Sequence, residues 1–275
     1  MICAWPELLG ILPQWLRPEV DRIGKDSLEE LRLRINAPPE LKIGDRYVLL
    51  ARHITPADVR FVVDHASSFS PWASESVSRG YLTAPGGHRI GLCGDAVCQQ
   101  DRVTGLREIH SLCIRVARDF PGIGEAVIQS KGSVLILGAP GWGKTTLLRD
   151  MIRKLAEKSP VAVVDERGEL FPKGFFRGSR VDVLTGAPKN QGMEMVLRTM
   201  GPRWIAVDEI TAAEDCAAVL HCYGCGVNLI ATAHAFSMAD FCSRTVYKQL
   251  LGASVFETCF VLRSDKSFRL ERITI

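Results

Sequence analysis

The sequence predicts two domains: a smaller α+β domain over residues 1–120, and an α/β domain over residues 121–275 whose sheet is mostly parallel. In the first part, short strand-like segments separated by glycine and proline turns surround one well-capped helix. In the second part, apolar strand-like segments alternate with helical patterns, which is typical of a parallel sheet covered on both faces. A glycine- and proline-containing linker, residues 118–124, separates the two. With 275 residues, 47% of them hydrophobic, the chain can fill two cores.

The N-terminal segment, residues 1–16, is rich in apolar residues and is predicted to form an amphipathic helix. Pro6 and Pro13 interrupt it, and it has neither a basic leader nor a small-residue cleavage site, so we do not expect a signal peptide. No apolar run approaches the roughly 20 residues that a membrane-spanning helix needs. We therefore expect a soluble protein without direct membrane insertion.

Short strands and one helix are expected in the rest of the first domain. Thr55 followed by Pro56 predicts the start of that helix. Gly86-Gly87, Gly94-Asp95 and the polar stretch 99–102 predict turns between strands. The expected strands are residues 31–35, 41–43, 47–50, 81–83, 88–93, 103–105 and 111–116.

Apolar and amphipathic segments alternate in the second domain. The expected central strands are residues 134–137, 161–164, 204–207 and 228–232. The expected helices are residues 144–157, 193–200, 212–221 and 238–249. Residues 256–263 and 268–273 predict a closing hairpin around an Asp-Lys turn.

A phosphate-binding loop is predicted between the first of these strands and the first of these helices. It fits the pattern G-x-x-x-x-G-K-[ST] with Gly138, Ala139, Pro140, Gly141, Trp142, Gly143, Lys144 and Thr145. Glycines let backbone N–H groups turn toward a phosphate, and the helix N-terminus adds partial positive charge. We expect Lys144 to reach the β- and γ-phosphates of ATP, Thr145 to bind Mg²⁺, and Thr146 to lie beside it on the helix. The alternative is a glycine-rich turn that binds nothing, and the flanking strand and helix argue against it.

Residues 204–209 read W-I-A-V-D-E, an apolar strand that ends in two carboxylates. Downstream of a phosphate loop, this is the expected second nucleotide-binding element. Asp208 is expected to hold Mg²⁺, directly or through water, and Glu209 to polarise the attacking water. The alternative is an exposed acidic turn, in which adjacent acids repel each other without compensation.

Two further strand ends carry candidate site residues. Asp165, Glu166 and Glu169 follow a predicted strand, and they either reach the same metal and water or form a solvated loop with local Glu–Arg pairs. Thr232 and His234 end another strand. The Thr232 hydroxyl and the His234 imidazole are candidates to sense the γ-phosphate or the nucleotide state, and a purely structural histidine is the alternative.

Together these motifs resemble the stage III sporulation protein AA family of endospore-forming bacteria, which is itself similar to the secretion ATPases of type II and type IV systems. The resemblance is carried by G-G-H-R-I-G-L at residues 86–92, G-W-G-K-T-T-L-L-R-D at 141–150, V-V-D-E-R-G-E at 163–169, D-V-L at 182–184, P-K-N-Q-G-M at 188–193, R-T-M-G-P at 198–202, V-D-E-I at 207–210 and A-T-A-H at 231–234. It covers nearly the whole chain.

The resemblance implies a RecA-like P-loop NTPase core with a smaller N-terminal α+β domain. It makes residues 165–169 the Asp box and residues 232–234 the His box, so that Glu166 and His234 are candidate catalytic residues with Glu209 and Lys144. Secretion ATPases often carry glycine where this chain has Asp208, and their His box is usually longer. Whether Glu209 or Glu166 is the effective base therefore stays open.

The resemblance also implies that arginines of the N-terminal domain approach the phosphates. Arg89 and Arg115 best match those positions, and Arg198 and Arg244 are weaker candidates for the same charge stabilisation. For each of them the alternative is an ordinary surface arginine.

The expected function is that of an ATPase that uses ATP and Mg²⁺, forms a homo-hexameric ring, and powers a sporulation transport complex between mother cell and forespore. Its expected partners are membrane proteins, and it is expected to be cytoplasmic, peripheral at the mother-cell membrane. The alternative is a scaffold that binds ATP without significant turnover. A net charge of +3 and 7% aromatic residues, with no basic stretch interleaved with aromatics, argue against a motor acting on nucleic acid.

Nine cysteines without a disulfide framework indicate a reducing compartment. Cys222 and Cys225 form a C-x-x-C pair, but no second ligand pair follows at zinc-site spacing. We interpret them as small structural residues late in a helix, with metal binding as the alternative.

Overall fold

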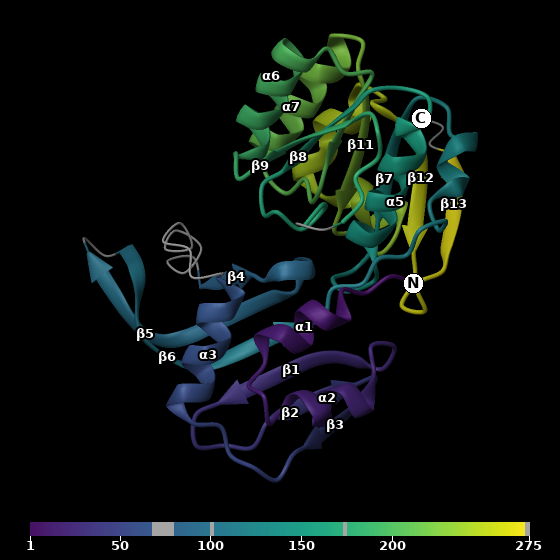
Figure 1. The fold of residues 1–275 in the computed structure, drawn as a ribbon. Helices are drawn as coiled ribbons and strands as arrows, with labels where there is room; N and C mark the ends of the chain where they lie inside the picture. Colours follow the sequence, from purple (N-terminus) through teal and green to yellow (C-terminus); the bar gives the residue numbers. More distant parts are fainter. Residues whose placement is uncertain (68–79, 100–101, 173–174, 273–275) are drawn as a thin grey trace. The chain divides into compact units, whose positions relative to one another are not determined.

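The computed structural model describes residues 1–67, 80–99, 102–172 and 175–272. The chain divides into two compact units, shown in Figure 1. Unit 1 comprises Met1–Asp119 and Pro172–Phe175, and unit 2 comprises Phe120–Phe171 and Phe176–Ile275. Each unit has its own sheet and its own hydrophobic core.

Unit 1 is built on a six-stranded antiparallel sheet with the order β3-β2-β1-β6-β5-β4. Its strands are β1 (Leu28–Arg34), β2 (Glu40–Ile43), β3 (Arg46–Leu49), β4 (Tyr81–Thr83), β5 (Arg89–Gln99) and β6 (Arg102–Arg115). Its helices are α1 (Trp5–Ile11), α2 (Arg17–Ile23), α3 (Pro56–Ala66) and the 3-10 turn η2 (Pro85–Gly87). Apolar side chains of the helices and the sheet, among them Leu8, Leu31, Val62 and Ile114, form the core.

Local sequence features explain where α3 begins and where α1 ends. The helix start predicted at Thr55 is confirmed, because Thr55 and Asp58 cap each other through side chain and backbone. The single helix predicted for residues 1–16 is wrong. Helix α1 ends before Leu12, which is extended because a position before proline disfavours the helical conformation. A separate helix, α2, begins at Arg17.

The short strands predicted between residues 88 and 116 are also a misinterpretation, because the described residues form two long paired strands, β5 and β6. Gly94 was expected to mark a turn, but it lies at an irregularity of the strand pairing. A Cβ at Gly94 would lie 1.6 Å from the carbonyl oxygen of Glu108, so only glycine allows the partner backbone to pass.

His88 lies in the interior of unit 1 and is fully buried. The Ala117 N–H donates to its Nδ1 at 3.1 Å, which leaves the hydrogen on Nε2 to donate to the Ala4 carbonyl at 2.8 Å. The neutral ring thereby joins three separate segments of the unit. Burial lowers the pKa of His88 below its ordinary value.

We expect the stability of unit 1 to depend on pH through His88. The folded pKa lies below the unfolded value of about 6.5, so this contribution is present above that pH and is lost as the pH falls through the folded pKa. The free energy of unfolding measured between pH 7.5 and 5.5 should therefore fall more steeply for the wild type than for His88→Phe. The exposed His53 provides the control, and His53→Asn should retain the wild-type slope. Equal slopes for wild type and His88→Phe would contradict the assignment.

Unit 2 is built on a seven-stranded sheet with the order β13-β12-β7-β11-β10-β8-β9. Its strands are β7 (Ser133–Leu137), β8 (Val161–Asp165), β9 (Val181–Thr185), β10 (Trp204–Val207), β11 (Asn228–Ala233), β12 (Phe256–Leu262) and β13 (Phe268–Arg272). Its helices are η3 (Glu125–Gln129), α5 (Lys144–Ala156), α6 (Lys189–Met200), α7 (Ala213–Gly224), α8 (Met238–Ser243), η4 (Thr245–Tyr247) and α9 (Lys248–Gly252). All neighbouring strands are parallel except β12 and β13.

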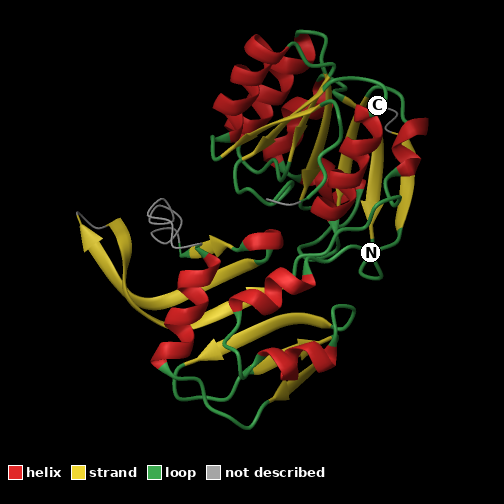
Figure 2. Ribbon diagram, viewed as in Figure 1, coloured by secondary structure: helices red, strands yellow, loops and turns green. Residues whose placement is uncertain are grey.

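Helices cover both faces of this sheet (Figure 2). Val134 and Ile136 of β7 pack in one core cluster with residues of α5, whereas Leu135 and Leu137 pack in another with residues of α6 and α7. This alternation explains why the central strands read as continuous apolar runs. Within the described residues, no helix has the length and apolar character that crossing a bilayer requires.

Unit 2 departs from the sequence expectations at one helix and contains one strand that was not predicted. The helix predicted over residues 238–249 is broken into α8, η4 and α9, because Arg244 adopts an extended conformation and its guanidinium turns back to Asp240. The edge strand β9 was not predicted as a strand, since its polar and partly exposed residues lack a continuous apolar run.

Helix α5 carries buried charged side chains that hold neighbouring backbone segments. The Asp150 carboxylate accepts the N–H groups of Gly122 and Gly124 at 2.8 and 2.7 Å, which fixes the linker against the helix. Arg153 donates to the carbonyl of Phe176 at 2.9 Å. Both places where the chain enters unit 2 are thus bonded to the helix that begins at the phosphate loop.

Gly124→Ala should destabilise unit 2. A Cβ at Gly124 would lie 2.5 Å from the Met151 nitrogen, and backbone cannot move aside as a side chain can. We expect a loss of about 1–3 kcal/mol in the free energy of unfolding, measured by denaturant titration. Gly224→Ala is the control, because a Cβ at Gly224 would have nothing within 4 Å of it, and its effect should stay within about 1 kcal/mol. Equal losses in the two variants would contradict the close approach.

Candidate functional site

The carboxyl ends of four neighbouring parallel strands, in the order β7-β11-β10-β8, bring the predicted site residues of unit 2 together. The phosphate loop follows β7, Asp208 and Glu209 follow β10, and Asp165 ends β8. Thr232 lies at the end of β11 and His234 follows it. Strand order therefore places motifs that are far apart in the sequence at one edge of the sheet.

The phosphate loop joins β7 to the N-terminus of α5. Gly141 and Gly143 have φ values of 77° and 97°, which are accessible to glycine at little cost. Lys144 is only 4% exposed, and its Nζ donates to the Ala139 carbonyl and to Nδ1 of His234, both at 3.1 Å. Burial lowers the pKa of Lys144, whereas the charges of Glu209 and Asp208 oppose that shift.

The remaining loop residues lie at the surface or pack beside it. Pro140 is exposed and Thr146 is partly exposed in the first turn of α5. Trp142 makes an edge-to-face contact with Phe236, with 5.8 Å between ring centroids. This contact gives Trp142 a packing role, joining the phosphate loop to the segment after His234.

Thr145 and Asp208 form a pair of oxygen ligands suited to Mg²⁺. The Thr145 hydroxyl donates to Oδ2 of Asp208 at 2.7 Å, so the two side chains meet although 63 residues separate them. Hydroxyl and carboxylate oxygens are hard ligands of the kind that Mg²⁺ prefers. The side chains at this position therefore fit the metal that the phosphate loop implies.

Thr232 orients both acids of the β10 end. Its hydroxyl donates to Oδ1 of Asp208 at 2.5 Å and accepts the backbone N–H of Glu209 at 2.8 Å. Glu209 has a positive φ of 50°, a conformation that a residue other than glycine rarely adopts. Thr232 was expected beside His234 at the end of a strand, but its bonds to Asp208 and Glu209 were not predicted.

His234 links the lysine of the phosphate loop to Glu209. A lysine ammonium can only donate, so Nδ1 of His234 accepts from Lys144 and its Nε2 carries the hydrogen. That Nε2 lies 3.0 Å from Oε1 of Glu209. The imidazole consequently bridges the two groups.

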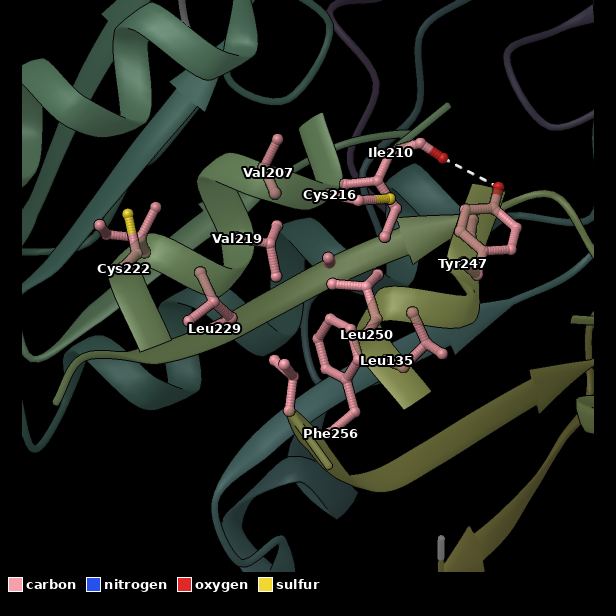
Figure 3. Close-up of a cluster of buried hydrophobic side chains, with 14 of the residues drawn as sticks. Leu135, Val207, Ile210, Cys216, Val219, Cys222, Leu229, Tyr247, Leu250 and Phe256 are labelled. Atoms are coloured by element: carbon pink, nitrogen blue, oxygen red, sulfur yellow. Dashed lines mark hydrogen bonds between the residues drawn. The ribbon is translucent and has the colours of Figure 1, made fainter. Parts of the chain in front are cut away.

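The chain beyond Glu209 is anchored in the hydrophobic core of unit 2. Figure 3 shows Tyr247 donating its hydroxyl hydrogen to the Ile210 carbonyl, at 3.0 Å, within this cluster. The Ile210 N–H donates in turn to the Thr232 carbonyl at 2.9 Å. Core packing therefore fixes the backbone on which Glu209 is carried.

Asp165 organises the loop that follows β8. It is 3% exposed and accepts the N–H groups of Glu169 and Leu170, both at 2.9 Å. Burial raises the pKa of Asp165, whereas the backbone N–H groups of Phe171 and Leu170 oppose that shift. Arg149 of α5 donates to the carbonyls of Glu169 and Leu170. These contacts assign Asp165 to the architecture of the loop.

The other charged side chains of this loop lie beside the β10 acids. Glu166 lies 3.0 Å from Nζ of Lys189, which is also 3.9 Å from Asp215. Nη1 of Arg167 lies 3.3 Å from Oε2 of Glu209. Lys189 and Arg167 were not among the predicted site residues, although the alternating acids and arginine of the Asp box could have drawn attention to Arg167. The pocket between these elements is lined by Asp165, Glu166, Arg167, Glu169, Lys189, Asp208 and Glu209.

The predicted arginines occupy two kinds of place. Arg89 and Arg115 belong to unit 1, where they are direct partners on the adjacent strands β5 and β6. Nε of Arg115 lies 3.7 Å from Glu30, and the Arg89 guanidinium lies over the Tyr81 ring. Like charges directly opposite each other are unfavourable in a sheet unless an anion lies near.

The two weaker arginine candidates have partners within their own segments. Arg198 is paired with Glu194 on α6, and Arg244 lies 3.0 Å from Asp240. The two cysteines of the C-x-x-C pair differ in burial, since Cys222 is buried in α7 and Cys225 is exposed just after it. None of these contacts joins Arg198, Arg244 or the two cysteines to the site residues at the carboxyl edge of the sheet.

Comparison with known proteins relates the chain to one family. Residues 8–271 match the family described as "Sporulation stage III, protein AA". Stage III sporulation protein AA of Bacillus subtilis (strain 168) is 36% identical over 281 residues, which cover 94% of this chain and 91% of that protein.

Solved structures share the fold at low sequence identity. The Legionella pneumophila ATPase DotB has a TM-score of 0.62 at 18% identity, over 93% of this chain and 78% of that chain. The pilus retraction motor PilT, solved with bound ADP, has a TM-score of 0.63 at 14% identity, over 94% of this chain and 82% of that chain. The predicted fold class, a RecA-like P-loop core with a smaller N-terminal α+β domain, is confirmed.

Proposed function

This chain belongs to the sporulation stage III protein AA family, and from that premise we propose that it is an ATPase that hydrolyses ATP to ADP and phosphate. One observation carries the proposal: the phosphate-loop hydroxyl of Thr145 meets Asp208, and Glu209 is held beside it by Thr232. A phosphate loop, a metal-ligand pair and a positioned acid are the parts that phosphoryl transfer to water requires.

In the proposed reaction, Lys144 and the loop N–H groups hold the β- and γ-phosphates. Thr145 and Asp208 hold Mg²⁺, which when bound neutralises charge on the phosphate oxygens. Glu209 orients a water molecule whose oxygen attacks the γ-phosphorus. The bond from that phosphorus to the β-γ bridging oxygen breaks, and the water proton passes to Glu209 or to a phosphate oxygen.

Glu209 is the better candidate for the base than Glu166. Glu209 follows β10, and its neighbour Asp208 touches the phosphate loop. Glu166 is engaged by Lys189 on α6 at 3.0 Å, and its loop follows β8, one strand farther from β7. Distance from the phosphate loop along the sheet thus favours Glu209, with Lys189 holding Glu166 in an ion pair.

We also propose that Arg89 and Arg115 supply positive charge to the phosphates in a homo-oligomeric ring, six subunits by the resemblance to secretion ATPases. Their adjacency on β5 and β6 gives two guanidinium groups on neighbouring strands, an arrangement that suits an anionic ligand. The family description supports a role in sporulation, where hydrolysis would energise a transport complex of membrane proteins between mother cell and forespore. The chain would act at the cytoplasmic face of the mother-cell membrane.

Phosphate release by the purified protein tests the proposed activity. With Mg²⁺-ATP, under conditions where the protein assembles, we expect turnover that Lys144→Ala lowers about a hundred-fold or more, because its ammonium no longer reaches the phosphates. The measurement is a steady-state phosphate assay, with mass measured in parallel with and without ATP. Turnover that is absent from the assembled wild type, or unchanged in Lys144→Ala, would refute the ATPase proposal.

A further inference from the structure

The carboxylate of Glu209 is held by protein groups on both of its oxygens. His234 lies 3.0 Å from Oε1, and Arg167 lies 3.3 Å from Oε2. A general base must direct an oxygen to the water that it activates. In this arrangement the proposed base is therefore engaged with its own neighbours.

Both of these contacts depend on cations that a phosphate would attract. Lys144 donates to His234 on the side away from Glu209, and its Nζ belongs to the phosphate loop. Arg167 is 57% exposed in its side chain, so its ion pair with Glu209 contributes little to stability and is easily exchanged. A guanidinium bonds strongly to phosphate oxygens and can do so through two N–H groups at once.

Arg167 also lies beside the two acids that follow β10. It lines the same pocket as Asp208 and Glu209. The other arginine near this loop, Arg149, donates to the backbone carbonyls of Glu169 and Leu170 instead. The loop thus presents an exposed guanidinium to the acids of the β10 end.

We propose that Arg167 exchanges Glu209 for the γ-phosphate of bound ATP. This rests on the proposed ATPase function and assigns a further catalytic residue to it. The exchange supplies positive charge to the transferring phosphoryl group from within the same chain. It also frees Oε2 of Glu209 only when a third phosphate is present, so that the base is available when its substrate is complete.

Nucleotide affinity tests the exchange without relying on turnover. Dissociation constants are measured with Mg²⁺ for a non-hydrolysable ATP analogue and for ADP, with the wild type, Arg167→Ala and Arg167→Lys. In Arg167→Ala, the dissociation constant of the analogue should rise about ten-fold, because only the analogue carries a γ-phosphate. The dissociation constant of ADP should stay within about two-fold of the wild-type value. Arg167→Lys, which keeps the charge, should recover part of the affinity.

Arg203→Ala is the matched control. Arg203 is an exposed arginine just before β10, at the opposite end of that strand from Asp208, and its replacement should change neither affinity. In the phosphate assay, Arg167→Ala should also lower turnover about a hundred-fold.

If Arg167→Ala weakens the binding of the analogue and of ADP equally, the role of Arg167 is structural. If neither affinity changes, Arg167 does not contact the γ-phosphate. Either result overturns the exchange, and if the wild type still hydrolyses ATP, the proposed function stands without it. A wild type that binds neither nucleotide overturns both proposals.

Discussion

Glu209→Gln is expected to bind Mg²⁺-ATP and to hydrolyse it about a thousand-fold more slowly than the wild type. The amide keeps the size of the side chain and can still accept from His234, but it cannot take up a proton from water. The backbone bond from Glu209 to Thr232 is unchanged, so the metal ligands stay in place. The variant should therefore retain ATP where the wild type retains ADP.

The nucleotide recovered from protein incubated with Mg²⁺-ATP, separated from free nucleotide and denatured, provides the measurement. Glu194→Gln, an exposed glutamate on α6, is the control and should behave as the wild type. If wild type and Glu209→Gln retain the same nucleotide in the same amount, a scaffold that binds ATP without turnover becomes the better account.

Thr232→Val should lower turnover about a hundred-fold although the two side chains have nearly the same shape. The methyl group cannot donate to Asp208 or accept the N–H of Glu209, so both acids of the β10 end lose their orientation. Half-maximal turnover should also require more Mg²⁺, because Asp208 is less well positioned. Loss of these buried bonds should reduce the free energy of unfolding by about 1–3 kcal/mol.

Thr258→Val separates the effect on turnover from the effect on stability. Thr258 is also buried in a strand of unit 2, and its hydroxyl donates to the Lys131 carbonyl at 3.3 Å, before β7 begins. Its replacement should lower stability but leave turnover near the wild-type rate. Similar turnover in the two valine variants would contradict the positioning role of Thr232.

Secondary structure was predicted correctly where the residues of a single segment determine it. Residues 204–207 form a strand with the predicted bounds, because an apolar run buried on both faces is visible in the sequence. The prediction failed where a contact with another part of the chain determines the local structure. Gly94 resembles a turn residue, and only the passage of the Glu108 backbone makes it part of a long strand. Similarly, α8 ends where Arg244 is extended and its guanidinium bonds to Asp240, a contact that exists only in the folded chain.

Some residues of the candidate site were likewise predicted from the sequence, and others could be assigned only from the structure. Lys144 and Thr145 were predicted because they belong to a motif with a fixed spacing, and Asp208 and Glu209 because they end an apolar strand downstream of that motif. The contacts of Thr232 and Arg167 depend on β11 lying between β7 and β10, and on β8 lying beyond β10. Nothing in the sequence states that order, so their roles could be assigned only from the structure. The roles of Arg89 and Arg115 remain predictions from resemblance.

Hydrolysis on the protein itself is the most direct test of the central claim, that the carboxyl edge of the unit 2 sheet catalyses phosphoryl transfer to water. The measurement is a single-turnover chemical quench, with full-length protein in excess over γ-labelled ATP and with Mg²⁺ present. The account predicts that the wild type converts bound ATP to ADP and phosphate, and that Glu209→Gln leaves it intact over the same time. ATP that stays bound and intact on the wild type throughout the time course would contradict it.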